Sequence, residues 1–197
     1  MTTELERIAR IAGRTARTTG SVRLGIGDDA AVLHTTPGYD TVVSSDLLVE
    51  GVHFQLDWTT PELLGRKAVA VSMSDMAAMG ALPRAVFLSL AIPHRVDDEF
   101  FDAFYTGAIG FAHRYGATIA GGDLSTSPGP LVIDSTVTGE VEQERALRRS
   151  GARPGDLLFV SGTLGSAAAG LRQLTAGLRL DTATTGMDLD AIRTHLV

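Results

Sequence analysis

The sequence lacks cysteine altogether and contains a single lysine among 197 residues. Without cysteine the chain can form no disulfide, thiolate zinc site or thiol nucleophile, which is typical of a cytoplasmic protein. Any chemistry that needs a lysine amine must use Lys67. No apolar run approaches the ~20 residues needed to cross a bilayer, so we expect no membrane span. The first ten residues also lack the apolar core of a signal peptide.

Two common nucleotide-binding motifs are missing or incomplete. No G-x-x-x-x-G-K-[ST] string occurs, which excludes a Walker-type phosphate loop. Gly25, Gly27 and Ala30 match the spacing of the dinucleotide fingerprint, but the residues after them are typical of a strand and a turn, whereas the fingerprint requires a helix. The net charge of −6 argues against nucleic-acid binding, which requires a basic surface.

The periodicity of the sequence indicates an α+β fold, in which helices pack on one face of a mixed β-sheet. Pro61 and Gly80 delimit a long helix that is apolar on most faces, so we expect it to be buried. Apolar residues at helical spacing predict a second long helix over 97–115. Shorter helices are predicted over 4–17 and 166–178, strands over 30–34, 40–46, 84–93, 117–121 and 131–141, an extended segment over 49–54 and a loop over 122–130.

A charged stretch that ends in proline and glycine suggests a boundary in the chain. We assign residues 1–141 to an N-terminal domain, 142–155 to a linker and 156–197 to the start of a second, α/β domain. In that last part, LLFVSG at 157–162 predicts a buried strand. One strand and two helices cannot bury a core alone, so we expect this second domain to be partial.

Acidic residues in four separate segments are the candidates for chemistry. Asp28 and Asp29 follow two glycines, Asp46 ends a predicted strand, Asp75 lies in an otherwise apolar helix, and Asp123 follows Gly-Gly at a strand end. Each could be structural, capping a turn or a neighbouring element. An aspartate in a buried helix is costly unless it is paired or coordinates a metal, and Mg²⁺ prefers oxygen ligands. We therefore expect Asp29, Asp46, Asp75 and Asp123 to converge on divalent cations.

Two further polar positions leave alternatives open. Arg66 and Lys67 lie on the same predicted helix as Asp75 and could be either a solvated basic pair or a phosphate contact. His53 lies in a segment continuous with Ser44, Ser45 and Asp46, and a lone histidine is more often a structural hydrogen-bonding residue than a functional one.

Five ordered strings in the sequence resemble thiamine-monophosphate kinase. They are GIGDDAAVL (25–33), SSDLLVEGVHF (44–54), GRKAVAVSMSDMAAMGA (65–81), GGD (121–123) and RSGARPGDLLFVSGTLG (149–165), and they run over nearly the whole chain. The resemblance implies a direct transfer of the γ-phosphoryl group of ATP to thiamine monophosphate, giving thiamine diphosphate. It also implies a cytoplasmic homodimer that forms through the sheet of the N-terminal domain.

The same resemblance implies roles for individual residues. Several Mg²⁺ ions would be held by Asp29, Ser44, Ser45, Asp46, Asp75 and Asp123. ATP would contact Tyr105, Gly121, Gly122 and Arg149, and His53 would contact thiamine monophosphate. Phosphoryl transfer depends mainly on positioning and charge neutralisation, so a site rich in acids and metals and poor in lysine is consistent with it.

One departure from the resemblance bears on activity. Members of that family are longer than this chain, and their second domain carries an Asp-x-Ser-Asp-Gly block that is absent here. We therefore expect a truncated chain that folds but is deficient in catalysis. Two alternatives stay open: another ATP-dependent synthetase of the same superfamily, and a non-catalytic nucleotide-binding or dimerisation module.

Overall fold

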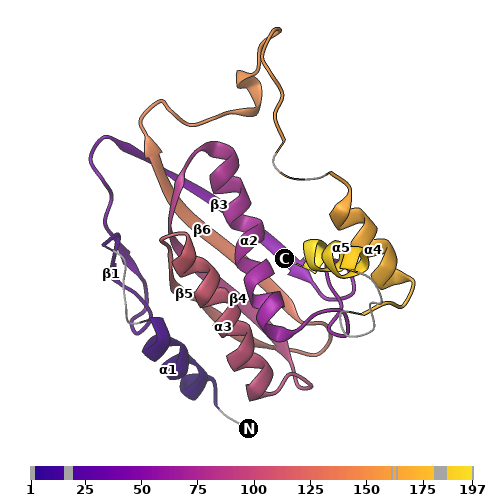
Figure 1. Ribbon diagram of the computed structural model, residues 1–197. Helices are drawn as coiled ribbons and strands as arrows, with labels where there is room; N and C mark the ends of the chain where they lie inside the picture. Colours follow the sequence, from indigo (N-terminus) through magenta and orange to yellow (C-terminus); the bar gives the residue numbers. More distant parts are fainter. Residues whose placement is uncertain (1–2, 16–19, 161, 163, 180–185, 197) are drawn as a thin grey trace.

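The computed structural model describes residues 3–15, 20–160, 162, 164–179 and 186–196, and it has helices on one face of a mixed sheet (Figure 1). The helices are α1 (Glu4–Thr15), α2 (Pro61–Met79), α3 (Asp98–Arg114), α4 (Ser166–Thr175) and α5 (Gly186–Leu196), with a short 3₁₀ turn at Arg149–Gly151. The strands are β1 (Val22–Leu24), β2 (Val32–Leu33), β3 (Tyr39–Val49), β4 (Leu82–Pro93), β5 (Thr118–Ser127) and β6 (Val132–Glu142). The predicted α+β class is confirmed. No helix in the described ranges is both long and apolar enough for a membrane span.

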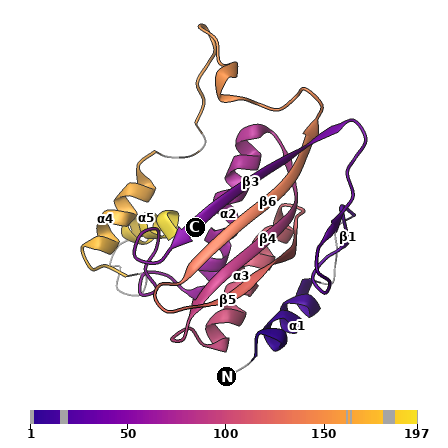
Figure 2. The ribbon, with the colours of Figure 1, turned by 180° about the vertical axis from the view of Figure 1, so that it is seen from behind.

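The main sheet has the strand order β3-β6-β4-β5. Strand β6 is antiparallel to both β3 and β4, whereas β4 and β5 are parallel and connected through α3. Helices α2 and α3 cover one face of this sheet, and the view from behind shows its other face (Figure 2). The short β1–β2 ribbon packs on the β4–β5 end of that second face through Val22, Ala85 and Ala120.

Helix α2 begins and ends as its sequence predicts. The Thr60 hydroxyl accepts a hydrogen bond from the backbone N–H of Leu63 (3.3 Å), Pro61 occupies the first turn, and Gly80 ends the helix with a φ of 71°. The helix is buried against the sheet and against α3, whose N-cap is Asp97. The core therefore lies between the helix layer and the sheet, as the apolar character of α2 suggests.

Helices α2 and α3 pack so closely that their backbones touch. A Cβ atom added to Gly65 would lie 1.9 Å from the carbonyl oxygen of Phe104, and one added to Gly107 would lie 1.9 Å from that of Glu62. These two glycines therefore fix the spacing of the helix layer. That spacing sets the position of Asp75, which α2 carries towards β3.

Three expectations about irregular segments are wrong. Strand β5 continues through most of the predicted loop, to Ser127, because its backbone pairs with β4 along that length. The segment after β3 turns instead of staying extended, and Gly51 adopts a φ of 85° there. Residues 157–160 form no strand and are between 62% and 98% exposed, because no strand of the described part of the chain lies beside them. Residues 161 and 163 lie outside the described residues.

The helical hairpin α4–α5 has a small core of its own and contacts the main domain. Leu174, Ile192 and Leu196 are buried together, and Trp58 packs against them. The Lys67 amine on α2 donates to the carbonyl oxygens of His53 (3.3 Å) and His195 (3.5 Å). Lys67 therefore connects α5 to the turn that carries His53.

Candidate functional site

The first group of candidate residues lies between β3 and α2. Side chains alternate along β3, so Ser44 and Asp46 face α2, and the Ser44 hydroxyl donates a short hydrogen bond to Asp75. Burial raises the pKa of Asp46, and the nearby carboxylates of Asp75 and Asp134 raise it further. We call Asp46 and Asp75 the acidic pair. The carboxylates of Asp46 and Asp75 are close enough to interact electrostatically, so they are suited to hold a cation between them.

Ser45 points to the opposite face of the sheet from Ser44. Its hydroxyl donates to Asp134 (2.9 Å) and shares a hydrogen bond with Thr136 (2.8 Å), both on β6. The Ser45 side chain is therefore separated by the sheet from the acidic pair, although the two serines are adjacent in sequence. Asp134 and Thr136 were missed by sequence reasoning, and the alternation of polar residues along β6 is the signal that could have found them.

The second group of candidates lines a cavity of about 930 Å³ at the β5 edge of the sheet. We call it the glycine-lined cavity, because residues 25–31 and the Gly121–Gly122 pair form one part of its wall. Asp28, Asp29 and Asp123 add carboxylates to that wall, and α1 supplies an apolar part. Pockets that bind small molecules have volumes of roughly 300–1,000 Å³, and the volume of this cavity lies within that range.

Gly122 is required by the backbone at this cavity. Its φ is 144°, and an added Cβ would lie 1.8 Å from the carbonyl oxygen of Leu88. Only glycine can therefore follow Gly121 while β4 and β5 remain paired. The absence of side chains there also leaves backbone exposed to a ligand, as phosphate-binding loops require.

Within one chain, the four predicted metal-binding aspartates form two groups instead of one. Asp46 is paired across the sheet with Ser135, Ser135 with Leu88, and Leu88 with Gly122, the residue before Asp123. Three strand spacings therefore separate the acidic pair from Asp123, or about 14 Å. Among the residues that the structure describes, no three histidine, aspartate or glutamate side chains are close enough together to hold a metal ion.

The remaining predicted residues have different environments. Tyr105 lines the glycine-lined cavity, although only 2% of its surface is exposed. Its ring packs against Phe101 and Phe104, and burial raises the pKa of its phenol. His53 is exposed, and its Nδ1 accepts a hydrogen bond from the backbone N–H of Val49 (3.0 Å), which leaves Nε2 to contact a ligand. Arg149 is exposed in the 3₁₀ turn and lines neither of the two larger cavities.

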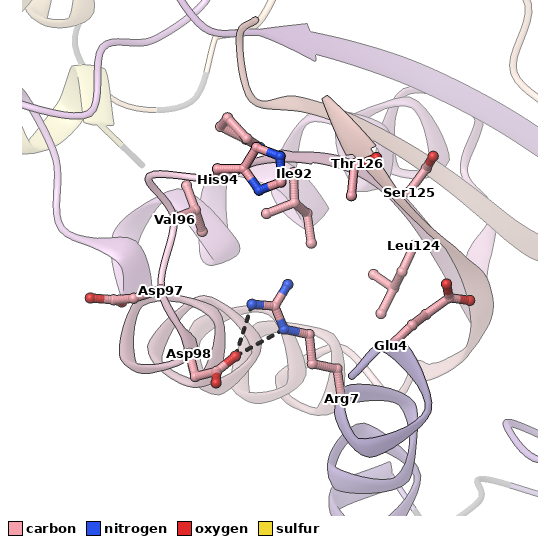
Figure 3. Close-up of a pocket in the computed structure, with 11 residues that line it drawn as sticks. Glu4, Arg7, Ile92, His94, Val96, Asp97, Asp98, Leu124, Ser125 and Thr126 are labelled. Atoms are coloured by element: carbon pink, nitrogen blue, oxygen red, sulfur yellow. Dashed lines mark hydrogen bonds and ion pairs between the residues drawn. The ribbon is translucent and has the colours of Figure 1, made fainter. Parts of the chain in front are cut away.

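A second cavity, of about 430 Å³, lies where α1, the end of β4 and the start of α3 meet (Figure 3). Arg7 extends from α1 into this space and pairs with Asp98 at 2.8 Å. Leu124, Ser125 and Thr126 of β5 lie opposite. Sequence reasoning did not predict this cavity, because it depends on how α1 docks against α3.

Most of the chain up to the end of the main sheet matches a known domain family. Residues 27–141 match the family model "AIR synthase related protein, N-terminal domain", which is more than half of the chain. The chain belongs to the AIR synthase related proteins. The matched residues include the acidic pair, the three aspartates of the glycine-lined cavity and all of the main sheet except its last residue, Glu142.

Several AIR synthase related proteins resemble this chain over most of its length. The thiamine-monophosphate kinase of Bacillus subtilis is 44% identical over 154 residues, which is 78% of this chain and 47% of the relative. That of Salmonella typhimurium is 39% identical over 193 residues, 98% of this chain and 58% of the relative. The chain therefore spans about half the length of the curated relatives it matches.

Solved structures give the same result. The thiamine-monophosphate kinase of Stenotrophomonas maltophilia matches with a TM-score of 0.82 and 40% identity, over 95% of this chain and 58% of the other. The structure of AaThiL complexed with AMPPCP and TMP matches with a TM-score of 0.74 and 32% identity, over 100% of this chain and 60% of the other. The resemblance to thiamine-monophosphate kinases seen in the sequence is thus confirmed.

Proposed function

We propose that this chain forms the ATP- and metal-binding part of a kinase that phosphorylates thiamine monophosphate. The observation that carries the proposal is the glycine-lined cavity, where bare backbone and three aspartates border one space large enough for a nucleotide. Its support comes from the similarity to thiamine-monophosphate kinases and to a structure that contains AMPPCP, an ATP analogue. In this proposal Gly121, Gly122 and Tyr105 contact ATP inside the cavity. Arg149 lies outside the cavity, so its contact with ATP stays a prediction of the resemblance.

The residues present fit Mg²⁺ in both groups of acids. The acidic pair offers two neighbouring carboxylates, together with the Ser44 hydroxyl, and all of these are hard oxygen ligands. Asp29 and Asp123 would hold Mg²⁺ at the cavity, where Asp28 adds charge. A metal-binding role for Ser45 stays a prediction of the resemblance, because the sheet separates its side chain from the acidic pair. Bound Mg²⁺ would neutralise the phosphates, which a chain of net charge −6 otherwise repels.

The proposed reaction needs little covalent help from the protein. An oxygen of the thiamine monophosphate phosphate attacks the γ-phosphorus of ATP, the bond from that phosphorus to the bridging oxygen breaks, and ADP leaves. His53 would orient the acceptor phosphate through Nε2, because Nδ1 is already occupied by the Val49 N–H. The Lys67 amine, which holds the His53 carbonyl, would keep that turn in place.

Titration calorimetry with Mg·ATP tests the proposal directly. We expect the 197-residue chain to bind ATP in the presence of Mg²⁺ and to lose that binding when EDTA removes the metal. ADP release should then be measured with and without thiamine monophosphate. Release that depends on thiamine monophosphate supports the kinase, whereas an absence of Mg·ATP binding would contradict the proposal. The rate of ADP release in the presence of thiamine monophosphate also measures the predicted deficiency in catalysis.

Two other functions give different results in these assays. A synthetase of the same superfamily would release ADP only with an acceptor other than thiamine monophosphate. A nucleotide-binding module would bind Mg·ATP and release no ADP with any acceptor, whereas a deficient kinase would release ADP slowly and only with thiamine monophosphate. The cytoplasmic location implied by the resemblance also stays a prediction.

We also propose that two copies associate through the sheet face opposite α2 and α3. On that face Val43 is 61% exposed and Leu47 is 54% exposed, and they flank Ser45 on β3. Exposed apolar side chains on a sheet face favour a contact with another apolar surface. Light scattering after gel filtration should give twice the chain mass of 20.7 kDa, and replacing both Val43 and Leu47 by aspartate should give the monomer. A monomeric unsubstituted chain would contradict this proposal.

A further inference from the structure

Helix α1 is attached to α3 along one side by a ladder of arginines. Arg7 pairs with Asp98 (2.8 Å) and Arg10 with Asp102 (2.7 Å), while Arg14 donates to Thr106 (2.6 Å) one turn further on. The guanidinium groups of Arg7 and Arg10 also lie over the Phe101 ring, at 5.1 and 5.9 Å from its centre. These contacts follow the helical repeat on both elements, so they fix the register of α1 on α3. Figure 3 shows the first of them, the Arg7–Asp98 pair.

The apolar side of the same helix borders the glycine-lined cavity. Leu5, Ile8 and Ile11 all line that cavity. Ile11 is buried in the main core, whereas Leu5 is 77% exposed. Ile8 lies between these two residues along the helix and is half-buried. The apolar wall of α1 therefore starts in the core and continues outward along the cavity, where Leu5 and Ile8 still have surface free for contact with a ligand.

The cavity thus combines two kinds of lining. Backbone of glycines and the carboxylates of Asp28, Asp29 and Asp123 suit phosphates with their metal ions. The α1 side chains that line the cavity, Leu5, Ile8 and Ile11, carry no hydrogen-bonding group, so they suit a flat apolar surface. An adenine base has such a surface on each face of its ring, and apolar and aromatic side chains commonly bind it.

We propose that α1 is the base-binding wall of the nucleotide site, with Leu5 and Ile8 in contact with the adenine ring. The inference rests on the proposed function, because it assigns the apolar part of the same cavity. The arginine ladder is then the positioning device: Arg10 and Asp102 are 34% and 45% exposed, so their pair adds little to global stability. Its main effect is to hold α1 at the distance from the cavity at which Leu5 and Ile8 touch the base.

The test compares two ligands, Mg·ATP and Mg·tripolyphosphate, by calorimetry on the 197-residue chain. Leu5→Asn and Ile8→Asn should each weaken ATP binding by about tenfold, the expected effect of losing one apolar contact, and leave tripolyphosphate binding unchanged. Ala9→Asn is the matched control, because Ala9 is exposed on the same helix and does not line the cavity. Leu5→Asn keeps the test valid even if Ile8→Asn impairs folding, since Leu5 is the more exposed residue.

A charge exchange tests the ladder separately. Arg10→Asp and Asp102→Arg should each weaken ATP binding by about threefold or more, and the double exchange should restore most of the loss. The inference is overturned if the α1 variants bind ATP as the unsubstituted chain does, or if they lose both ligands equally. If the unsubstituted chain binds Mg·tripolyphosphate as tightly as Mg·ATP, the inference about α1 is overturned and the proposed function is not. If the unsubstituted chain binds neither ligand, the proposed function is overturned as well.

Discussion

Gly107→Ala is expected to lower the melting temperature by ~10 °C or more, which corresponds to a loss of about 3–5 kcal/mol. The new methyl group would lie 1.9 Å from the carbonyl oxygen of Glu62, and the clash is with backbone, so no side chain can rotate away from it. Helices α2 and α3 would have to separate, which would also move Asp75 away from Ser44. Thermal unfolding followed by circular dichroism measures the effect.

Gly110→Ala is the matched control for this prediction. Gly110 lies on the same helix, one turn further on, and an added Cβ there meets nothing within 4 Å. Alanine in an exposed helix position is better than glycine by about 0.5–1 kcal/mol, so this variant should be slightly more stable. If both variants melted at the same temperature, the close contact between the two helices would be refuted.

Asp46→Asn is expected to abolish the stabilisation of the chain by Mg²⁺. Burial, followed by Asp75 and Asp134, raises the pKa of Asp46, so its protonated form favours the folded state. This contribution is fully present below the pKa in the unfolded chain and is lost as the pH rises through the folded pKa. Ionised Asp46 is therefore unfavourable at neutral pH without metal, and the asparagine variant should melt ~1–3 °C higher in EDTA.

Mg²⁺ should stabilise the unsubstituted chain and leave the variant almost unchanged. A site exposed to tenfold more metal than its Kd gains about 1.4 kcal/mol, or ~3–6 °C in melting temperature. The gain should shrink as the pH falls through the pKa of Asp46, because protons compete with the metal. Asp40→Asn, an exposed aspartate on the same strand, controls for net charge. An equal response to Mg²⁺ in the Asp46 and Asp40 variants would rule out a site at the acidic pair.

Local signals predicted the main elements well, and long-range pairing decided where they failed. Pro61 and Gly80 defined α2 because capping is a local effect. Strand β5 was predicted to end at Gly121 because the glycine- and serine-rich residues 122–130 are typical of a loop, while pairing with β4 extends the strand to Ser127. The apolar residues 157–160 read as a buried strand, yet a strand exists only beside a partner.

The candidate site was predicted by residue type, and its geometry was not. The alternation along β3 could have shown that Ser44 and Ser45 face opposite sides of the sheet. The spacing between Asp46 and Asp123 depends on the strand order β3-β6-β4-β5, which no local pattern encodes. The docking of α1, and with it the apolar part of the cavity, depends on ion pairs between residues more than 90 positions apart.

The single lysine makes the docking of α5 open to chemical measurement. Burial lowers the pKa of Lys67, whose amine is held between the carbonyl oxygens of His53 and His195. Apart from the α-amino group, it is the chain's sole primary amine, the group that amine-selective acylating reagents modify. Its labelling rate therefore reports, at one defined atom, how often the C-terminal hairpin leaves the turn that presents His53.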